Sequence, residues 1–164
     1  MEVIYIPQLL KAPQHSQSIP LDDFVPGLDI LTPLRGTMVV THRGTYLEVS
    51  VSAETIITLT CDRCLRQYNH RLVLNTSELI WLDENAQEAK TYPQEREIAW
   101  EDLSESLPPD GHFSPDSWLY EQLSLTMPLR RICDKNCPGP VIENAESKPL
   151  IDSRWAALEA LKKD

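Results

Sequence analysis

Glycine is scarce in this sequence, and its scarcity excludes several common kinds of enzyme. Only five glycines occur in 164 residues, and none belongs to a Gly-x-Gly-x-x-Gly, Gly-x-x-x-x-Gly-Lys or Gly-x-Ser-x-Gly motif. Dinucleotide-binding, P-loop and serine-hydrolase sites of the usual kinds are therefore excluded. The histidines are also dispersed, with none at the spacing of a second metal site: His15, His42, His70 and His112. Because the sequence shows no catalytic constellation, we predict that the protein is not an enzyme.

Long hydrophobic runs are absent as well. No stretch of the sequence approaches the ~20 apolar residues that a transmembrane helix needs. The first residues, MEVIYIPQLLKAPQ, contain neither a basic region nor a long apolar region, so we expect no signal peptide. These features predict a cytoplasmic protein that does not bind membranes. They leave its oligomeric state open.

Positive charge is in short supply. Fifteen lysines and arginines stand against 25 aspartates and glutamates, which gives a formal net charge of -10. This balance argues against a general nucleic-acid coat and against a binder of anionic membranes. Much of the acidity lies between Glu78 and Asp110, with an acidic loop at about 83–97. We interpret this segment as solvated surface that maintains solubility, with a basic partner as the alternative.

The hydrophobic pattern predicts an antiparallel sheet. Residues 1–33 contain five spaced prolines and are expected to form a mostly irregular arm packed on the body. From Leu34 the apolar residues alternate, which indicates a hairpin of long strands that turns at 42–45 and has one buried face. A third strand is expected at about 68–82. Its expected core positions are Leu72, Leu74, Leu79 and Trp81.

Two short helices complete the predicted α+β fold. Ser114-Pro115-Asp116 combines a capping hydroxyl, a proline at the first helical position and an early carboxylate, and Met127-Pro128 ends the helix. A second, amphipathic helix is expected from Asp152. Short strands are expected at 98–100 and near 112–113.

The chemistry of the chain is concentrated in its four cysteines. They form two close pairs, Cys61 with Cys64 and Cys133 with Cys137. Four thiolates in two such pairs match tetrahedral zinc, and a shell filled by four protein ligands is typical of a structural metal site. We therefore predict a four-cysteine zinc knuckle that holds structural Zn²⁺.

Other interpretations of the cysteines stay open. Iron or a thiol redox switch would use the same residues. Two disulfides are disfavoured because we expect no export signal. A lone redox Cys-x-x-Cys would not require the second pair.

Basic residues surround the cysteines in an otherwise acidic chain: Arg63, Arg66, Arg71, Arg130, Arg131 and Lys135. Part of this positive charge compensates the -2 charge of a zinc tetrathiolate. The remainder could contact a few phosphates. These six residues are therefore the candidates for RNA contact, with charge compensation as the favoured interpretation.

The order of these elements resembles the YceD family, also catalogued as domain of unknown function 177. Cys61-Asp62-Arg63-Cys64-Leu65 is similar to its C-x-R-C-L element. Leu125-Thr126-Met127-Pro128 followed by Cys133 and Cys137 resembles its second cysteine element, and residues 152–158 resemble its closing segment. On this resemblance, residues 34–164 form a single YceD-like domain.

The resemblance implies a non-enzymatic factor that supports large-subunit rRNA accumulation or ribosome assembly. Its expected partner is large-subunit rRNA or a basic large-subunit ribosomal protein. Two alternatives come from other functional classes. One is a thiol/zinc redox-sensing protein, and the other is an accessory structural subunit of a larger assembly.

Overall fold

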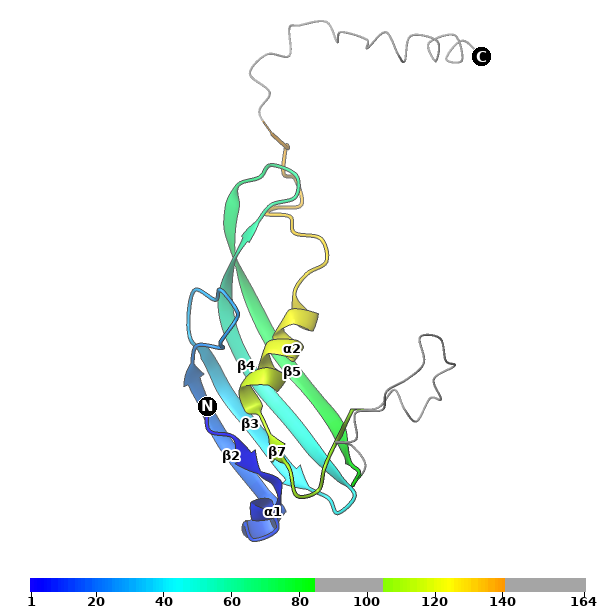
Figure 1. Ribbon diagram of the computed structural model, residues 1–164. Helices are drawn as coiled ribbons and strands as arrows, with labels where there is room; N and C mark the ends of the chain where they lie inside the picture. Colours follow the sequence, from blue (N-terminus) through cyan, green and yellow to red (C-terminus); the bar gives the residue numbers. More distant parts are fainter. Residues whose placement is uncertain (85–104, 141–164) are drawn as a thin grey trace, which may run out of the picture.

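A computed structural model describes residues 1–84 and 105–140. These residues form a five-stranded sheet and a two-stranded sheet, with helices on one face of the larger sheet (Figure 1). The larger sheet has the order β2-β3-β4-β5-β6. Its strands are β2 (Ser16–Asp23), β3 (Leu34–His42), β4 (Tyr46–Thr60), β5 (Gln67–Leu82) and β6 (Ser106–Leu107). The smaller sheet pairs β1 (Ile4–Tyr5) with β7 (His112–Phe113), and the helical elements are α1 (Ile6–Leu9), the 3-10 turn η1 (Pro13–His15) and α2 (Pro115–Thr126).

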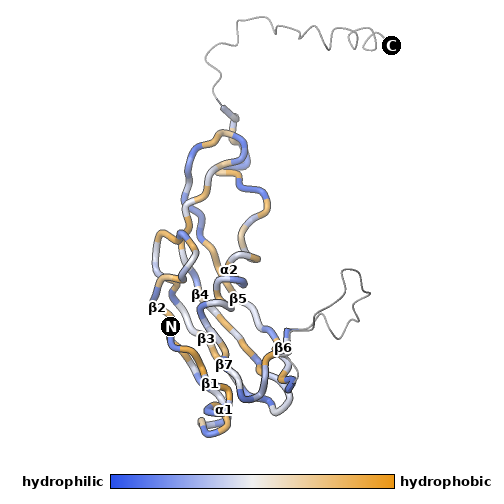
Figure 2. The backbone as a smooth tube through the Cα atoms, in the orientation of Figure 1, coloured by the Kyte–Doolittle hydropathy of each residue, from blue (hydrophilic) through white to orange (hydrophobic). Residues whose placement is uncertain are grey.

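The period-two pattern explains the central strands and the core between the sheet and α2. β3 pairs antiparallel with β4, and β4 pairs antiparallel with β5 over fifteen residue pairs. The odd-numbered residues of β4 from Leu47 to Leu59 are buried, whereas the even-numbered ones are partly or fully exposed. This alternation follows the strands in Figure 2. It places one hydrophobic face beneath α2 and the β1–β7 pair, and leaves the other face to solvent.

The expected core of the third strand was partly wrong. Leu72 and Leu74 are buried, but Leu79 and Trp81 are 50% and 46% exposed, and Ile80 is fully buried in their place. Side chains on a strand alternate between faces, so positions 72, 74 and 80 share the inner face and the odd-numbered positions cannot. Large apolar side chains occur on both faces of this strand, and the prediction changed face between residues 74 and 79.

The N-terminal residues are more regular than their prolines suggest. Residues 16–23 form the eight-residue strand β2 at the edge of the sheet, paired antiparallel with β3, where a mostly irregular arm was expected. A proline lacks the N–H that a sheet ladder needs, so it is tolerated at an edge. Pro20 lies on this edge strand. The residues before and after β2 that contribute to the core are Ile4, Ile6, Leu9, Val25 and Ile30.

The helix expected at Ser114 is α2, and its ends are confirmed. Ser114 is the N-cap residue, and its hydroxyl accepts a hydrogen bond from the Ser117 amide. Met127 is the C-cap. Trp118, Leu119 and Leu123 lie on the buried side of the helix, which packs mainly against β5. The strand expected near 112–113 is β7. The acidic loop at 83–97 for the most part, the strand at 98–100 and the helix from Asp152 lie outside the described residues.

Candidate metal centre

The four cysteines meet at one end of the molecule, although 68 residues separate the two pairs in the chain. β4 and β5 extend past the rest of the sheet, and their turn carries Cys61 and Cys64 (Figure 1). The segment after α2 returns beside this turn and brings Cys133 and Cys137. The four Sγ atoms all lie within 4.8 Å of one another. Cys61, Cys64 and Cys137 are buried and Cys133 is half-buried.

The sulfur positions fit a tetrahedral metal site. Cys61 Sγ lies 3.9 Å from Cys137 Sγ, and Cys64 Sγ lies 3.7 Å from Cys133 Sγ. Four thiolates at about 2.3 Å from a central Zn²⁺ would lie about 3.8 Å apart. A disulfide needs about 2.05 Å between its sulfurs, and all four cysteines are free. The close approach of four thiols from two loops therefore favours a tetrahedral divalent metal over two disulfides.

One backbone hydrogen bond and two hydrogen bonds between side chain and backbone hold the two cysteine loops against each other. The Asp62 amide donates to the Arg131 carbonyl at 2.7 Å, and the Arg131 amide donates to Asp62 Oδ2 at 2.7 Å. The Arg63 guanidinium donates to the Cys137 carbonyl at 2.8 Å. Together these contacts form an Asp62–Arg131 clamp and an Arg63 bridge that align the two pairs of ligands.

The first loop closes tightly around its sulfurs. The Cys61 amide donates to the Arg66 carbonyl, and the Leu65 amide donates to the Cys61 carbonyl, both at 2.9 Å. Leu65 has a φ of 61°, in the left-handed region that costs energy for a side chain with a Cβ. The Cys133 amide points to Cys61 Sγ from the second loop at 3.5 Å. Amides aimed at sulfur stabilise the thiolate form that a metal requires.

Neighbouring groups shift the pKa of three of the thiols, Cys61, Cys64 and Cys133. Backbone hydrogen bonds from Cys64 and Cys133 lower the pKa of Cys61 to about 6. Hydrogen bonding to Cys137, followed by burial, raises the pKa of Cys133 to about 12. Four adjacent sulfurs cannot all carry negative charge without a compensating cation. A divalent metal would supply that charge and allow all four to act as thiolates.

The six basic residues that are candidates for RNA contact make different interactions in the structure. The Arg66 guanidinium contacts the Cys64 sulfur, which raises the pKa of Arg66, and Arg63 is committed to the Cys137 carbonyl. Arg71 lies on β5 and forms an ion pair with Glu54. All six side chains are exposed, and within the described residues Arg130, Arg131 and Lys135 have no side-chain partner.

Sequence reasoning missed residues that support the centre and one that supports the core. Tyr68 and Ile132 pack against the cysteines. The hydrogen bonds of Asp62 to the second loop were also missed, and the sequence signal for them was an acidic residue directly after a cysteine ligand. Glu78 was assigned to the solvated acidic segment, which is wrong for this residue. It lies on the inner face of β5, where its Oε2 accepts hydrogen bonds from Trp118 Nε1 at 2.6 Å and Gln122 Nε2 at 2.8 Å.

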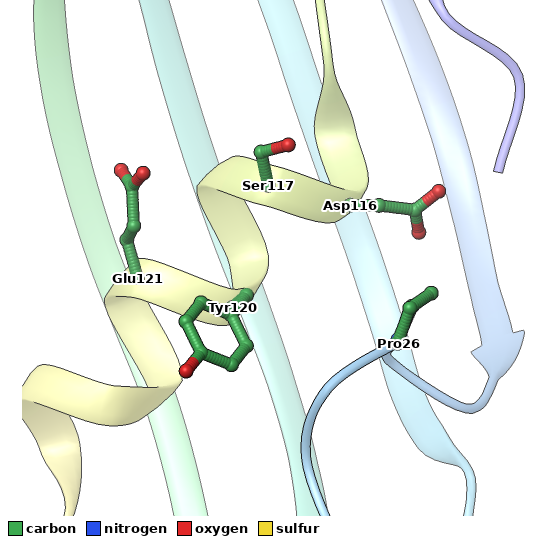
Figure 3. Close-up of a pocket in the computed structure, with 5 residues that line it drawn as sticks. All are labelled: Pro26, Asp116, Ser117, Tyr120 and Glu121. Carbon is green, nitrogen blue, oxygen red and sulfur yellow. The ribbon is translucent and has the colours of Figure 1, made fainter.

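A separate recess of about 400 Å³ lies beside α2, and none of the cysteines lines it. It is lined by Pro26, Asp116, Ser117, Tyr120 and Glu121 (Figure 3). Asp116 is bound to the Met1 ammonium at 2.6 Å. The lining residues include no histidine, cysteine or lysine that could act as a base or nucleophile beside these carboxylates.

The described helices also include none long and apolar enough to cross a membrane.

Fold and site together define a class: a sheet-rich α+β protein with a cluster of four cysteines suited to a metal ion. Comparison with known families then identifies the group. The family model described as "Large ribosomal RNA subunit accumulation protein YceD" matches residues 49–162, and the chain belongs to this family. The match includes all four cysteines. Comparisons with curated proteins and with solved structures found no match.

Proposed function

We propose that this protein is a cytoplasmic, non-enzymatic factor, stabilised by structural zinc, that supports large-subunit rRNA accumulation or assembly of the large ribosomal subunit. The observation that carries the proposal is the family match over residues 49–162. The tetrathiolate geometry supports a structural rather than a catalytic metal, because four protein ligands leave no position for a reacting water. The YceD-like domain of residues 34–164 would present this centre at one end, and the N-terminal residues would complete its sheet through the edge strand β2.

Metal content tests the first half of the proposal. Protein purified without added metal should contain about one equivalent of zinc, and elemental analysis separates zinc from iron. Cys61→Ser should lose the metal, whereas Ser50→Ala, on the preceding strand β4, should retain it. A folded wild-type protein with four freely titratable thiols and no metal would contradict a zinc centre.

Association with ribosomal particles tests the second half. The tagged protein should co-purify with components of the large subunit, and RNase treatment shows whether the association depends on RNA. Loss after RNase favours rRNA as the partner, whereas retention favours a basic ribosomal protein. Failure to associate with either would contradict the proposed function.

Direct RNA contact would use the free basic side chains beside the centre. Binding of single-stranded RNA should weaken with salt by a slope of about -0.7 per phosphate neutralised. Replacing both Arg130 and Arg131 with Gln should flatten the slope by about 1.4, with the metal content unchanged. Arg35→Gln with Arg43→Gln is the charge-matched control, because both arginines lie on or beside β3 in exposed ion pairs. Equal slopes for the two double variants would exclude this surface.

A further inference from the structure

Among the residues that the structure describes, the outer edge of β5 is unpaired along most of its length. β5 has sixteen residues, and β4 pairs with its inner edge from Gln67 to Trp81. On the other edge, among the described residues, only the two-residue strand β6 pairs with it, at Trp81 and Leu82. An open edge is a row of unused hydrogen-bond donors and acceptors, which is a template for another strand.

The hydrogen-bond pattern shows which backbone groups are unused. The Leu82 amide donates to the Thr45 carbonyl on the β4 side, whereas the Trp81 amide donates to the Glu105 carbonyl on the opposite side. Because N–H directions alternate along a strand, the even-numbered residues of β5 bond to β4. The odd-numbered residues from Asn69 to Leu79 therefore direct their N–H and C=O groups away from the sheet. In the described part of the chain, none of these six residues has a backbone partner on that side.

The two edges of the sheet differ in how they are protected. On β2 the even-numbered residues face outward, because the residues opposite them on β3 use their N–H groups toward β4. Pro20 occupies one of these outward positions, where it removes a donor and blocks a further strand. The open stretch of β5 contains no proline, and its one charged outward residue, Arg71, is paired with Glu54. Of the two described edges of the five-stranded sheet, the β5 edge is therefore the one suited to strand addition.

The surroundings of this edge select the charge of a partner. Three glutamates lie at the β6 end of this edge. Glu78 is on β5, the Glu105 carbonyl accepts from the Trp81 amide just before β6, and Glu121 adjoins Gln122, which donates to Glu78 Oε2. The pKa of Glu105 is raised by loss of solvent and then by the negative charges of Glu78 and Glu121. A cationic segment would relieve the repulsion among these carboxylates.

We propose that the outer edge of β5, from Asn69 to Leu79, binds an extended basic protein segment as an added strand. Main-chain hydrogen bonds to the odd-numbered residues would supply affinity, and the neighbouring glutamates would select positive charge. The inference deepens the proposed function, on which it rests for the ribosomal setting of the partner.

A defined peptide tests the edge in the purified protein. The probe is an 11-residue peptide of alternating lysine and threonine, labelled for fluorescence anisotropy. Its control has the same sequence with three N-methylated backbone nitrogens, which keeps the charge and removes donors. Amide hydrogen exchange followed by NMR should show added protection at residues 69, 71, 73, 75, 77 and 79. The even-numbered amides, already bonded to β4, should not change. Equal binding of both peptides, or protection without this alternation, would overturn the proposal.

Substitutions on the protein give a second test. Ser77→Pro removes one outward N–H without touching a bond to β4, and should weaken peptide binding at least about fivefold, whereas Ser77→Ala should not. Glu105→Gln with Glu121→Gln should also weaken it, and Asp22→Asn with Asp23→Asn, on the β2 edge, is the charge-matched control. Where Ser77→Pro does not fold, the methylated peptide on the wild-type protein decides the question.

The remaining outcomes separate this inference from the proposed function. A dimer whose interface protects the same odd-numbered amides would replace the basic segment with a second copy and overturn the proposal. Another outcome is a folded Ser77→Pro variant that loses peptide binding and still associates with ribosomal particles. That result would support the proposed function and show that the β5 edge does not contribute to it. The peptide could also protect alternate amides of β5 in a protein that does not associate with ribosomal particles. That result would support strand addition at the β5 edge and contradict the proposed ribosomal function.

Discussion

Loss of a metal ligand should unfold the cysteine end of the molecule and leave the body folded. The structure divides the buried apolar residues into two clusters. One is the large core beneath α2, and the other contains the cysteines with Tyr68 and Ile132. The segment after α2 would therefore be held to the β4–β5 turn by a metal bound to the four cysteines and by a few hydrogen bonds. Cys137→Ser should release this segment, because little other apolar surface secures it.

The magnitude follows from the free energy that a bound metal would supply to the closed site. Structural zinc contributes on the order of 10 kcal/mol in small zinc-binding domains. The 69 residues from Cys64 to Cys133 include β5 and α2, which stay folded, so the loss concerns only the local closure of the two loops. If loss of one of the four ligands removes about 4 kcal/mol of this free energy, local opening increases roughly a thousandfold.

Native-state hydrogen exchange measures both regions in one experiment. In Cys137→Ser, the amides of Cys61 and Asp62 should exchange roughly a thousandfold faster or more, whereas the amides that join β3 and β4 should change little. Ser50→Ala, on β4, is the control, and addition of a zinc chelator to the wild-type protein should reproduce the pattern. Equal acceleration across the whole sheet would refute the division into two units. Unchanged exchange at both ends would refute a metal that holds the loops together.

Three further predictions concern the core, the acid limit and oxidation. Glu78→Ala should destabilise the protein by about 2–4 kcal/mol in urea unfolding, because it leaves the buried Trp118 N–H without its acceptor; Glu54→Ala, in an exposed ion pair, should cost under about 1 kcal/mol. Burial, and then the charge of His15, lowers the pKa of His42, so the unfolded state binds a proton first. Stability should fall as the pH drops below about 6.5, and His42→Gln should flatten this dependence; an unchanged pH profile would contradict the assignment. Mild peroxide should release the metal slowly because three of the four cysteines are buried, and rapid release that a thiol reductant reverses would favour the redox alternative.

Much of the fold was determined by local sequence patterns. Alternation of apolar residues determined which face of β4 is buried, because the geometry of a strand sends successive side chains to opposite faces. The serine, proline and aspartate at 114–116 determined where α2 begins, because each satisfies or complements the exposed end of a helix. The spacing within each cysteine pair predicted two metal-binding loops. These signals act over a few residues and need no knowledge of the rest of the chain.

Tertiary structure decided what distant segments do to one another. It placed β2 at the edge, turned Leu79 and Trp81 outward, and recruited Glu78 to bind Trp118 from a helix forty residues away. It also brought the two cysteine pairs together through the Asp62–Arg131 clamp and, within residues 1–84 and 105–140, left the outer edge of β5 unpaired from Asn69 to Leu79. Such outcomes depend on which faces and backbone groups remain unpaired after the sheet assembles. That is a property of the packed chain, whereas the local patterns are properties of short stretches of sequence.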